Sequence, residues 1–196
     1  VLYHRRIVAH GGEATESAGA TKAVEQHLER QKANAEVGYS GDKLSRRVGY
    51  LVEDDPPAVS IIIPTRDRVE LLRACVQSIL ERTAYPSFDV ILVDNGSRAP
   101  ATLDYLVSIS NEPRIRVLRQ DEEFNYSRLN NCGVRNSSAE FILLMNNDVK
   151  VINSGWLEEM VSYGIQPRVG AVGARLLYPD NRVQQAGVIL GAGVHG

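Results

Sequence analysis

The feature that most constrains the fold is a series of three short apolar runs, each followed at once by polar residues. The runs are residues 59–63, 90–93 and 141–145. Their length and their content of Val, Ile and Leu are typical of strands buried on both faces of a parallel sheet. Apolar residues recur at helical spacing in the stretches between and after them, which are residues 68–82, 102–108, 126–137 and 156–163. Strands that alternate with helices predict an α/β domain with a mainly parallel sheet flanked by helices.

Two further extended segments are predicted in this part of the chain, over residues 115–118 and 169–177. The first 55 residues are polar and weakly patterned, with a helix predicted over residues 21–33 and short strands over 35–39 and 46–52. The acidic, proline-containing residues 53–57 are typical of a linker. We therefore divide the chain into residues 1–55, an appendage that ends in a linker, and residues 56–196, the α/β domain.

Composition narrows the class of partner. The net charge of −2 gives no electrostatic reason to expect nucleic acid or an anionic membrane as a partner. No apolar run approaches the roughly 20 residues that a membrane-spanning helix needs. The two cysteines, Cys75 and Cys132, fall in predicted helices and favour a reducing compartment over a disulfide framework. We expect a cytoplasmic protein, which in its full length could lie at the inner face of a membrane.

Polar clusters follow each of the three runs. They are Thr65-Arg66-Asp67, Asp94-Asn95 and Asn146-Asn147-Asp148. Ligands of open parallel sheets bind outside the carboxyl ends of the strands, so we expect these clusters to meet around one ligand. Oxygen-bearing side chains of this kind suit a hard divalent cation, Mg²⁺ or Mn²⁺.

Each cluster also has a purely structural interpretation. Asn146-Asn147-Asp148 and Asp94-Asn95-Gly96-Ser97 are both good turn sequences. Asp67 is expected to be the N-cap of the helix that follows, with Glu70 as its capping-box partner. The amino end of that helix could favour a diphosphate, although a carboxylate in the cap would partly oppose it.

The order of the three motifs along the chain points to a family, which no single motif does. Residues 59–65 (VSIIIPT), 90–97 (VILVDNGS) and 140–148 (EFILLMNND) together resemble the family 2 glycosyltransferases with a GT-A fold. The resemblance begins near residue 58, extends to residue 196 and includes the three donor-side motifs of the family. Residues 124–133 and 169–180 resemble the branch found in multi-domain bacterial enzymes that build surface polysaccharides of the O-antigen or rhamnan type. The implied fold is a GT-A sheet, truncated at its carboxyl end and preceded by a small helical and extended appendage. Residues 1–4 and 23–28 resemble the tail that precedes such domains in tandem enzymes, so the resemblance implies that residues 1–55 are the tail of an upstream domain plus a linker.

The resemblance implies a role for individual residues. Asp148 corresponds to the last acid of the DxD motif, the ligand of the metal and the diphosphate. Asn146 stands where the first acid would be, so the segment 146–148, with Asn147 at its centre, brings one fewer negative charge to the metal. Asp94, beside Asn95, matches the acid that contacts the nucleobase of the donor.

The remaining donor-side residues come from two other segments. Pro64, Thr65 and Arg66, followed by Asp67, match the loop that lies along the nucleoside. Asn130 stands where many relatives have an arginine, which leaves the identity of the donor base open.

The implied reaction is inverting and metal-dependent. A divalent cation makes the nucleoside diphosphate a better leaving group, and a carboxylate deprotonates the hydroxyl of a saccharide acceptor. We expect this base beyond Gly196, in further domains or segments of the full-length chain, because no acidic motif of the family follows Asp148. Glu158 and Glu159 are predicted to lie on the solvated face of a helix, and Asp180 in a turn.

Two alternatives stay open, a binding module and a nucleotidyltransferase. The chain could be a non-catalytic module that binds a nucleotide-sugar within a larger synthase. A nucleotidyltransferase would need a glycine-rich triphosphate loop after the first strand, and residues 65–68 contain no glycine. Residues 191–196 match G-x-G-x-x-G, but a dinucleotide fold has that motif at its start, so we interpret them, with His195, as a loop.

Overall fold

The computed structural model describes residues 13–39, 46–52 and 54–187. The chain forms two compact units, divided between Leu51 and Val52. In the smaller unit, helix α1 (Glu13–Gln31) is followed by the antiparallel strands β1 (Ala35–Tyr39) and β2 (Arg46–Tyr50). Leu28 of α1 is buried, and the Arg46 guanidinium donates a hydrogen bond to the Thr21 hydroxyl at 2.7 Å. Helix α1 begins well before the start that apolar spacing predicted.

The larger unit is built on a four-stranded parallel sheet. Its strands are β3 (Val59–Thr65), β4 (Phe88–Asp94), β5 (Ile115–Arg119) and β6 (Phe141–Leu144). They lie in the order β5-β4-β3-β6, and every pair is parallel. The helices that connect and follow them are α2 (Val69–Arg82), α3 (Pro100–Ile109), α4 (Tyr126–Arg135) and α5 (Trp156–Gly164). The predicted α/β fold with a parallel sheet is confirmed.

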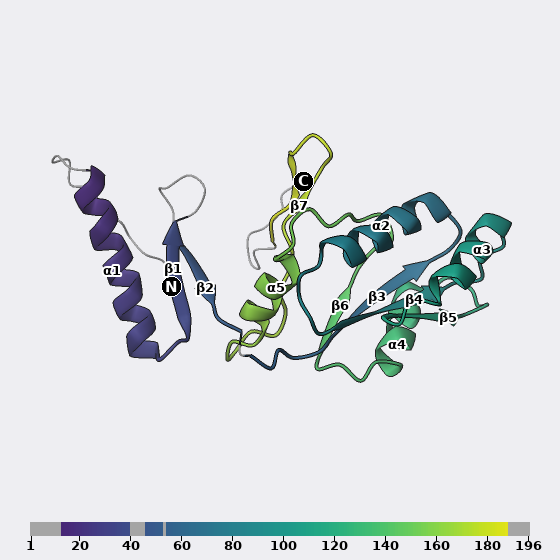
Figure 1. The fold of residues 1–196 in the computed structure, drawn as a ribbon, viewed down its shortest axis with the longest axis horizontal. Coiled ribbons are helices and arrows are strands. Elements are labelled where there is room, and N and C mark those ends of the chain that lie inside the picture. The colour runs from purple at the N-terminus through teal and green to yellow at the C-terminus, as the bar shows by residue number, and fades with distance from the viewer. Residues whose placement is uncertain (1–12, 40–45, 53, 188–196) are drawn as a thin grey trace, which may run out of the picture. The chain divides into compact units, whose positions relative to one another are not determined.

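The two faces of the sheet bury alternate residues of the central strands, as the two-residue period of a strand requires. Ile61 and Ile63 of β3 pack in a core with residues of α2, α3 and α5. Ile62 packs on the opposite face with Leu129 and Cys132 of α4. Figure 1 shows α2 and α4 on opposite sides of the strands. The apolar runs of β3 and β4 are therefore buried from both sides.

Helix α4 approaches the sheet closely because it carries a glycine at the contact. A Cβ atom at Gly133 would collide with the Cγ2 atom of Ile62 on β3. Asn125, which precedes α4, caps the helix by accepting a hydrogen bond from the Arg128 amide at 2.9 Å.

Three local expectations are corrected by the structure. The chain runs through Pro64, and β3 ends at Thr65. The strand β6 is at the edge of the described sheet rather than buried, with Ile142 38% and Leu144 50% exposed. In the predicted extended segment 169–177, only β7 (Leu176–Leu177) is a strand, and it pairs with β8 (Val183–Gln185) in an antiparallel hairpin.

Candidate functional site

The carboxyl ends of β3, β4 and β6 are joined by hydrogen bonds into one edge. The Asn95 amide donates to the Thr65 carbonyl at 2.8 Å, which joins β4 to β3. The Asn147 side-chain amide donates to the Thr65 hydroxyl at 3.0 Å, which joins the segment after β6 to the same residue. Thr65 is therefore the point at which the three strand ends meet.

A cleft of about 310 Å³ opens at this edge. Its lining comes from four places in the chain: the end of β3 with the loop after it, the residue after β4, the start of α4 with the loop before it, and the segment after β6. The lining residues are Pro64, Thr65, Arg66, Arg68, Asn95, Phe124, Tyr126, Leu129, Asn146, Asn147 and Asp148. The structure thus gathers most of the predicted binding residues around one cleft.

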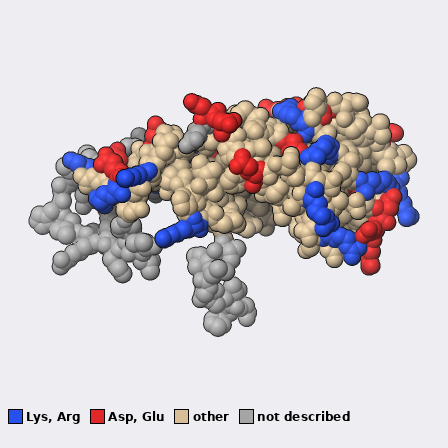
Figure 2. All heavy atoms as spheres, turned by 90° about the horizontal axis from the view of Figure 1, so that it is seen from below, with Lys and Arg blue, Asp and Glu red and all other residues tan. Residues whose placement is uncertain are grey.

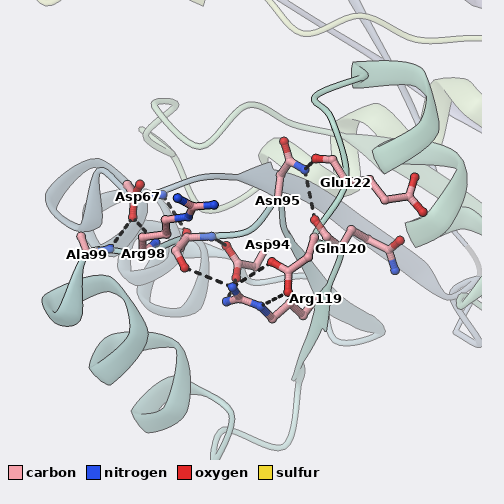
Figure 3. Close-up of polar contacts among 10 residues, drawn as sticks. Asp67, Asp94, Asn95, Arg98, Ala99, Arg119, Gln120 and Glu122 are labelled. Carbon is pink, nitrogen blue, oxygen red and sulfur yellow. Dashed lines mark hydrogen bonds and ion pairs between the residues drawn. The ribbon is translucent and has the colours of Figure 1, made fainter.

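The loop between β3 and α2 has an unusual backbone. Asp67 and Arg68 both have left-handed φ angles, 51° and 54°, which is uncommon for residues other than glycine. Asp67 does not cap α2, because Arg68 precedes the helix without a side-chain cap. The Asp67 carboxylate instead accepts hydrogen bonds from the amides of Arg98 and Ala99 at 2.9 and 2.8 Å. The capping-box prediction is wrong, since the loop turns this side chain toward the start of α3 (Figure 3).

Asp67 and Ser97 hold the two loops together from both sides. The Asp67 amide donates to the Ser97 hydroxyl at 2.7 Å, while the Asp67 carboxylate binds the two amides that follow Ser97. Hydrogen bonds from the Ala99 and Arg98 amides lower the pKa of the Asp67 carboxyl group, because they favour its charged form. These bonds fix the loop that carries the cleft residues Arg66 and Arg68.

Asp94 lies behind the cleft rather than in its lining. Its carboxylate is 1% exposed, accepts a hydrogen bond from the Ser97 amide at 3.0 Å and pairs with Arg119 at 2.9 Å. Gly96 completes this turn with a φ of 68°, where a Cβ atom would meet the Asp121 carboxylate at 2.9 Å. Arg119 (Figure 3) also donates to the Ser97 carbonyl at 3.2 Å and pairs with Asp121 at 2.8 Å. The turn interpretation of residues 94–97 therefore describes what Asp94 does in this structure.

Asn95, the neighbour of Asp94, does line the cleft. Its side-chain nitrogen donates to the Gln120 and Glu122 carbonyls at 3.1 and 2.8 Å. Its side-chain oxygen is buried and has no hydrogen-bond partner among the described residues. A buried acceptor without a partner is uncommon in proteins, and here it belongs to a residue of the cleft.

The segment after β6 presents its side chains openly. Asn146 and Asp148 are exposed, and Asn147 is half-buried. Beneath them, the Cys75 thiol lies 3.7 Å from the Asn146 carbonyl oxygen. Burial, with a contribution from the Asp148 charge, raises the pKa of Cys75 to about 12. Cys75 is therefore a neutral thiol buried in the core beneath this segment, and not a reactive one.

Charged side chains of the larger unit show no single-sign patch on the face seen in Figure 2, where basic and acidic residues are interspersed. Several of them are paired, as in Arg116 with Asp89 at 2.8 Å and Arg128 with Glu122 at 2.6 Å. In contrast, the guanidinium groups of Arg66 and Arg68 in the cleft form no hydrogen bond or salt bridge with another described residue. Two cationic groups are therefore available to a ligand beside the Asp148 carboxylate.

The sequence model of Glycosyl transferase family 2 matches residues 60–190. The chain belongs to this family. The match covers the cleft and all of the parallel sheet except Val59, so the geometry above is that of the family 2 domain.

Two curated relatives are similar over nearly the whole chain. The O-antigen biosynthesis protein RfbC of Myxococcus xanthus is 42% identical over 199 aligned residues, which cover 97% of this chain and 15% of RfbC. The uncharacterized protein y4gI of Sinorhizobium fredii is 47% identical, over 88% of this chain and 19% of y4gI. The chain thus spans less than a fifth of the length of either relative.

A solved structure agrees in fold. The mannosyltransferase PcManGT of Pyrobaculum calidifontis, in complex with GDP-Man and Mn²⁺, aligns with a TM-score of 0.57 at 19% identity. The alignment covers 85% of this chain and 46% of that chain. The family 2 domain described here has the GT-A fold.

Within the family 2 domain, some residues named from the sequence lie away from the cleft lining. Asn130 is buried and donates from its side chain to the Tyr126 carbonyl at 2.9 Å, and its side-chain oxygen has no partner among the described residues. Glu158 and Glu159 are exposed in the first turn of α5. Asp180 lies in a turn, where its carboxylate forms a salt bridge with the Arg182 guanidinium at 2.7 Å. His195 and the glycine motif 191–196 lie outside the described residues.

Sequence reasoning missed four lining residues of the cleft. They are Arg68, Phe124, Tyr126 and Leu129. Arg68 could have been predicted from the sequence, since it directly follows residues 65–67, which were named as part of the same loop. The other three come from α4 and the loop before it, and only the close packing of α4 on β3 brings that end of the helix to the cleft.

No helix in the described part of the chain has the length and apolar content that crossing a membrane would require.

Proposed function

We propose that this domain binds a nucleotide-diphosphate sugar in the cleft and transfers the sugar to a saccharide acceptor, with inversion and with the help of a divalent cation. The observation that carries the proposal is the hydrogen bond between Asn147 and Thr65. It joins the segment that resembles the DxD motif to the loop that resembles the nucleoside loop, around one cleft that also has free cationic groups.

The residues present fit a divalent cation shared with a ligand. Asp148 offers an exposed carboxylate, and Asn146 offers an exposed amide oxygen beside it. Magnesium is commonly held by one or two carboxylates together with substrate phosphates. The described residues contain no group of three or more His, Cys, Asp or Glu side chains around one point, so phosphate oxygens and water would supply the other ligands. The bound cation would neutralise the diphosphate and make it a better leaving group.

The chain's own residues would bind and orient the donor. Arg66 and Arg68 attract the diphosphate, since both guanidinium groups lack a salt bridge within the described structure. Asp67 keeps these two residues in place by tying their loop to the start of α3. Asp94 supports the same edge from behind by fixing the turn that ends β4.

A test is the thermal unfolding of the chain with UDP, dTDP, CDP, GDP and ADP, each with and without Mn²⁺. We expect UDP or a related pyrimidine diphosphate to raise Tm only when metal is present, because ligands that bind the folded state stabilise it by about 2.7 kcal/mol at 100 times Kd. Asp148→Ala should abolish the shift. The matched control is Asp104→Ala, which changes an exposed carboxylate on α3, outside the cleft.

Equal shifts in Tm with and without metal would contradict the role of Asp148 as a metal ligand. No shift with any nucleotide would contradict the proposal as a whole.

A second candidate is a non-catalytic module that binds the nucleotide-sugar within a longer synthase. One observation favours it: among the described lining residues, Asp148 is the only carboxylate, so the part of the cleft described here has no second acid to act as the base. The discriminating experiment is a transfer assay on the full-length protein, with hydrolysis of the nucleotide-sugar as the control reaction. Transfer that is lost in the Asp148→Ala variant would exclude the non-catalytic module.

The similarity to RfbC suggests a role for the full-length protein in building a bacterial surface polysaccharide. We also propose a cytoplasmic location, supported by the two free and buried cysteines, Cys75 and Cys132.

A further inference from the structure

The cleft has two chemically different sides. Arg66, Arg68 and Asp148 give it charge at the ends of β3 and β6. Phe124, Tyr126 and Leu129, from α4 and the loop before it, give it apolar surface. A nucleoside diphosphate has the same division, with an aromatic ring at one end and negative charge at the other.

Phe124 is the most exposed aromatic side chain of the cleft. It is 62% exposed, whereas Phe88 is 8% exposed and Phe141 packs against the main core. Tyr126 beside it is 44% exposed. Exposing this much apolar ring surface to water is unfavourable, by about 25 cal/mol for each Å² of apolar surface left in water. A ligand ring placed against Phe124 would cover that surface.

The loop that carries Phe124 is anchored on both sides of the ring. Before it, the Glu122 carbonyl accepts a hydrogen bond from the Asn95 side chain at 2.8 Å. After it, Asn125 caps α4 through the Arg128 amide at 2.9 Å. Arg128 also pairs with the Glu122 carboxylate at 2.6 Å. The backbone that carries the exposed ring is thus anchored by contacts that Phe124 does not itself make.

We propose that Phe124, assisted by Tyr126, is the wall on which the base of the donor nucleotide stacks, a proposal that rests on the proposed function. The base lies on the α4 side, and the diphosphate lies toward Arg66, Arg68 and Asp148. Aromatic side chains stack with any of the bases, because every base has a π face. The wall therefore supplies affinity, and the choice of base falls to polar groups.

Asn95 is a polar residue that lines the cleft together with Phe124. Two backbone carbonyls hold its side-chain nitrogen, so its orientation is fixed and its unpaired oxygen can only accept a hydrogen bond. An acceptor matches a base that presents an N–H group, such as the imide of uracil or thymine.

The experiment measures Kd by calorimetry on the whole 196-residue chain, with Mn²⁺ present. The probes are inorganic pyrophosphate, a short saccharide and the nucleoside diphosphate of the panel that stabilises the wild type most. Phe124→Ala should raise the nucleotide Kd about tenfold, since base–aromatic stacking contributes roughly 1–3 kcal/mol. Pyrophosphate should bind the variant and the wild type equally, because it has no base. Phe124→Trp should restore the nucleotide affinity, and Phe124→Leu should not.

Tyr178→Ala is the matched control, since Tyr178 is 46% exposed and lies outside the cleft; it should leave every Kd unchanged. An equal loss of pyrophosphate and nucleotide affinity in Phe124→Ala would overturn the stacking role and indicate a distorted cleft. A loss confined to the saccharide would overturn it in favour of an acceptor wall. If the wild type binds the nucleotide and Phe124→Ala binds it as tightly, this inference fails and the proposed function stands. If the wild type binds no nucleotide, both fail.

Discussion

Asp94 and Asp148 end two strands of the same sheet, yet their surroundings are opposite. The Asp94 carboxylate is 1% exposed and holds both the Ser97 amide and the Arg119 guanidinium. Asp148 is exposed at the cleft, and no hydrogen bond or salt bridge joins it to another described residue. A carboxylate whose bonds are all made within the protein stabilises the fold, whereas one left open is available to a ligand. The comparison shows that position at a strand end does not by itself define a binding residue.

The largest effect on stability should come from Asp94. We expect Asp94→Ala to lower the free energy of unfolding by about 2–3 kcal/mol, because hydrogen bonds to charged groups contribute roughly 1.5–3 kcal/mol and Arg119, being 45% exposed, can be rehydrated. Urea unfolding followed by circular dichroism measures the change. Asp104→Ala, on the exposed side of α3, is the control and should change stability by less than about 0.5 kcal/mol. A similar small change in Asp94→Ala would erase the contrast between the two acids.

Asp67 should have a smaller effect that depends on pH. Its pKa in the folded chain is lowered by hydrogen bonds from the Ala99 and Arg98 amides. A group with a depressed folded pKa stabilises the fold above its unfolded pKa, about 3.9, and loses that contribution as pH falls through the folded pKa. The urea midpoint of the wild type should therefore fall between about pH 5 and pH 2 more steeply than that of Asp67→Asn. Parallel curves for the two proteins would show that the carboxylate charge at Asp67 does not stabilise the loop.

The smallest effect on stability should come from Asp148. Without a ligand, Asp148→Ala should unfold within about 0.5 kcal/mol of the wild type, as surface substitutions away from structural features usually do. The same urea titration that is used for Asp94 tests it. Together with the loss of the nucleotide-dependent shift, this result would separate binding from stability at the two strand ends. A loss as large as that of Asp94→Ala would assign Asp148 a structural role as well.

The sequence predicted the parts of the fold that depend on composition over several residues. The central strands β3 and β4 were predicted because a β-branched run buried on both faces is recognisable without knowing its neighbours. The similar run at β6 was interpreted in the same way, but its burial depends on its place in the sheet. At the edge of the described sheet, Ile142 and Leu144 are exposed. Strand order is a tertiary property, and a short apolar run does not encode it.

The site shows the same limit at the level of single residues. Asp67 has the local signature of a helix cap, but a left-handed turn at Arg68 and the amides of Arg98 and Ala99 provide a competing arrangement. Arg119 lies in no motif, and Phe124 begins the segment 124–133 without a role of its own, because the positions of both follow from how the β5 and α4 segments pack. The convergence of Thr65, Asn95 and the segment 146–148 was predictable, because the ends of parallel strands meet at one edge.

The exposed β6 strand has a practical consequence for handling the chain. Its outer edge has backbone groups that no other described strand pairs, and its apolar Ile142 and Leu144 side chains are open to water. Such an edge can template the addition of a strand from another molecule. Concentrated preparations of these 196 residues should therefore tend to self-associate through β6, and a lysine introduced at position 144 should improve solubility without altering the cleft.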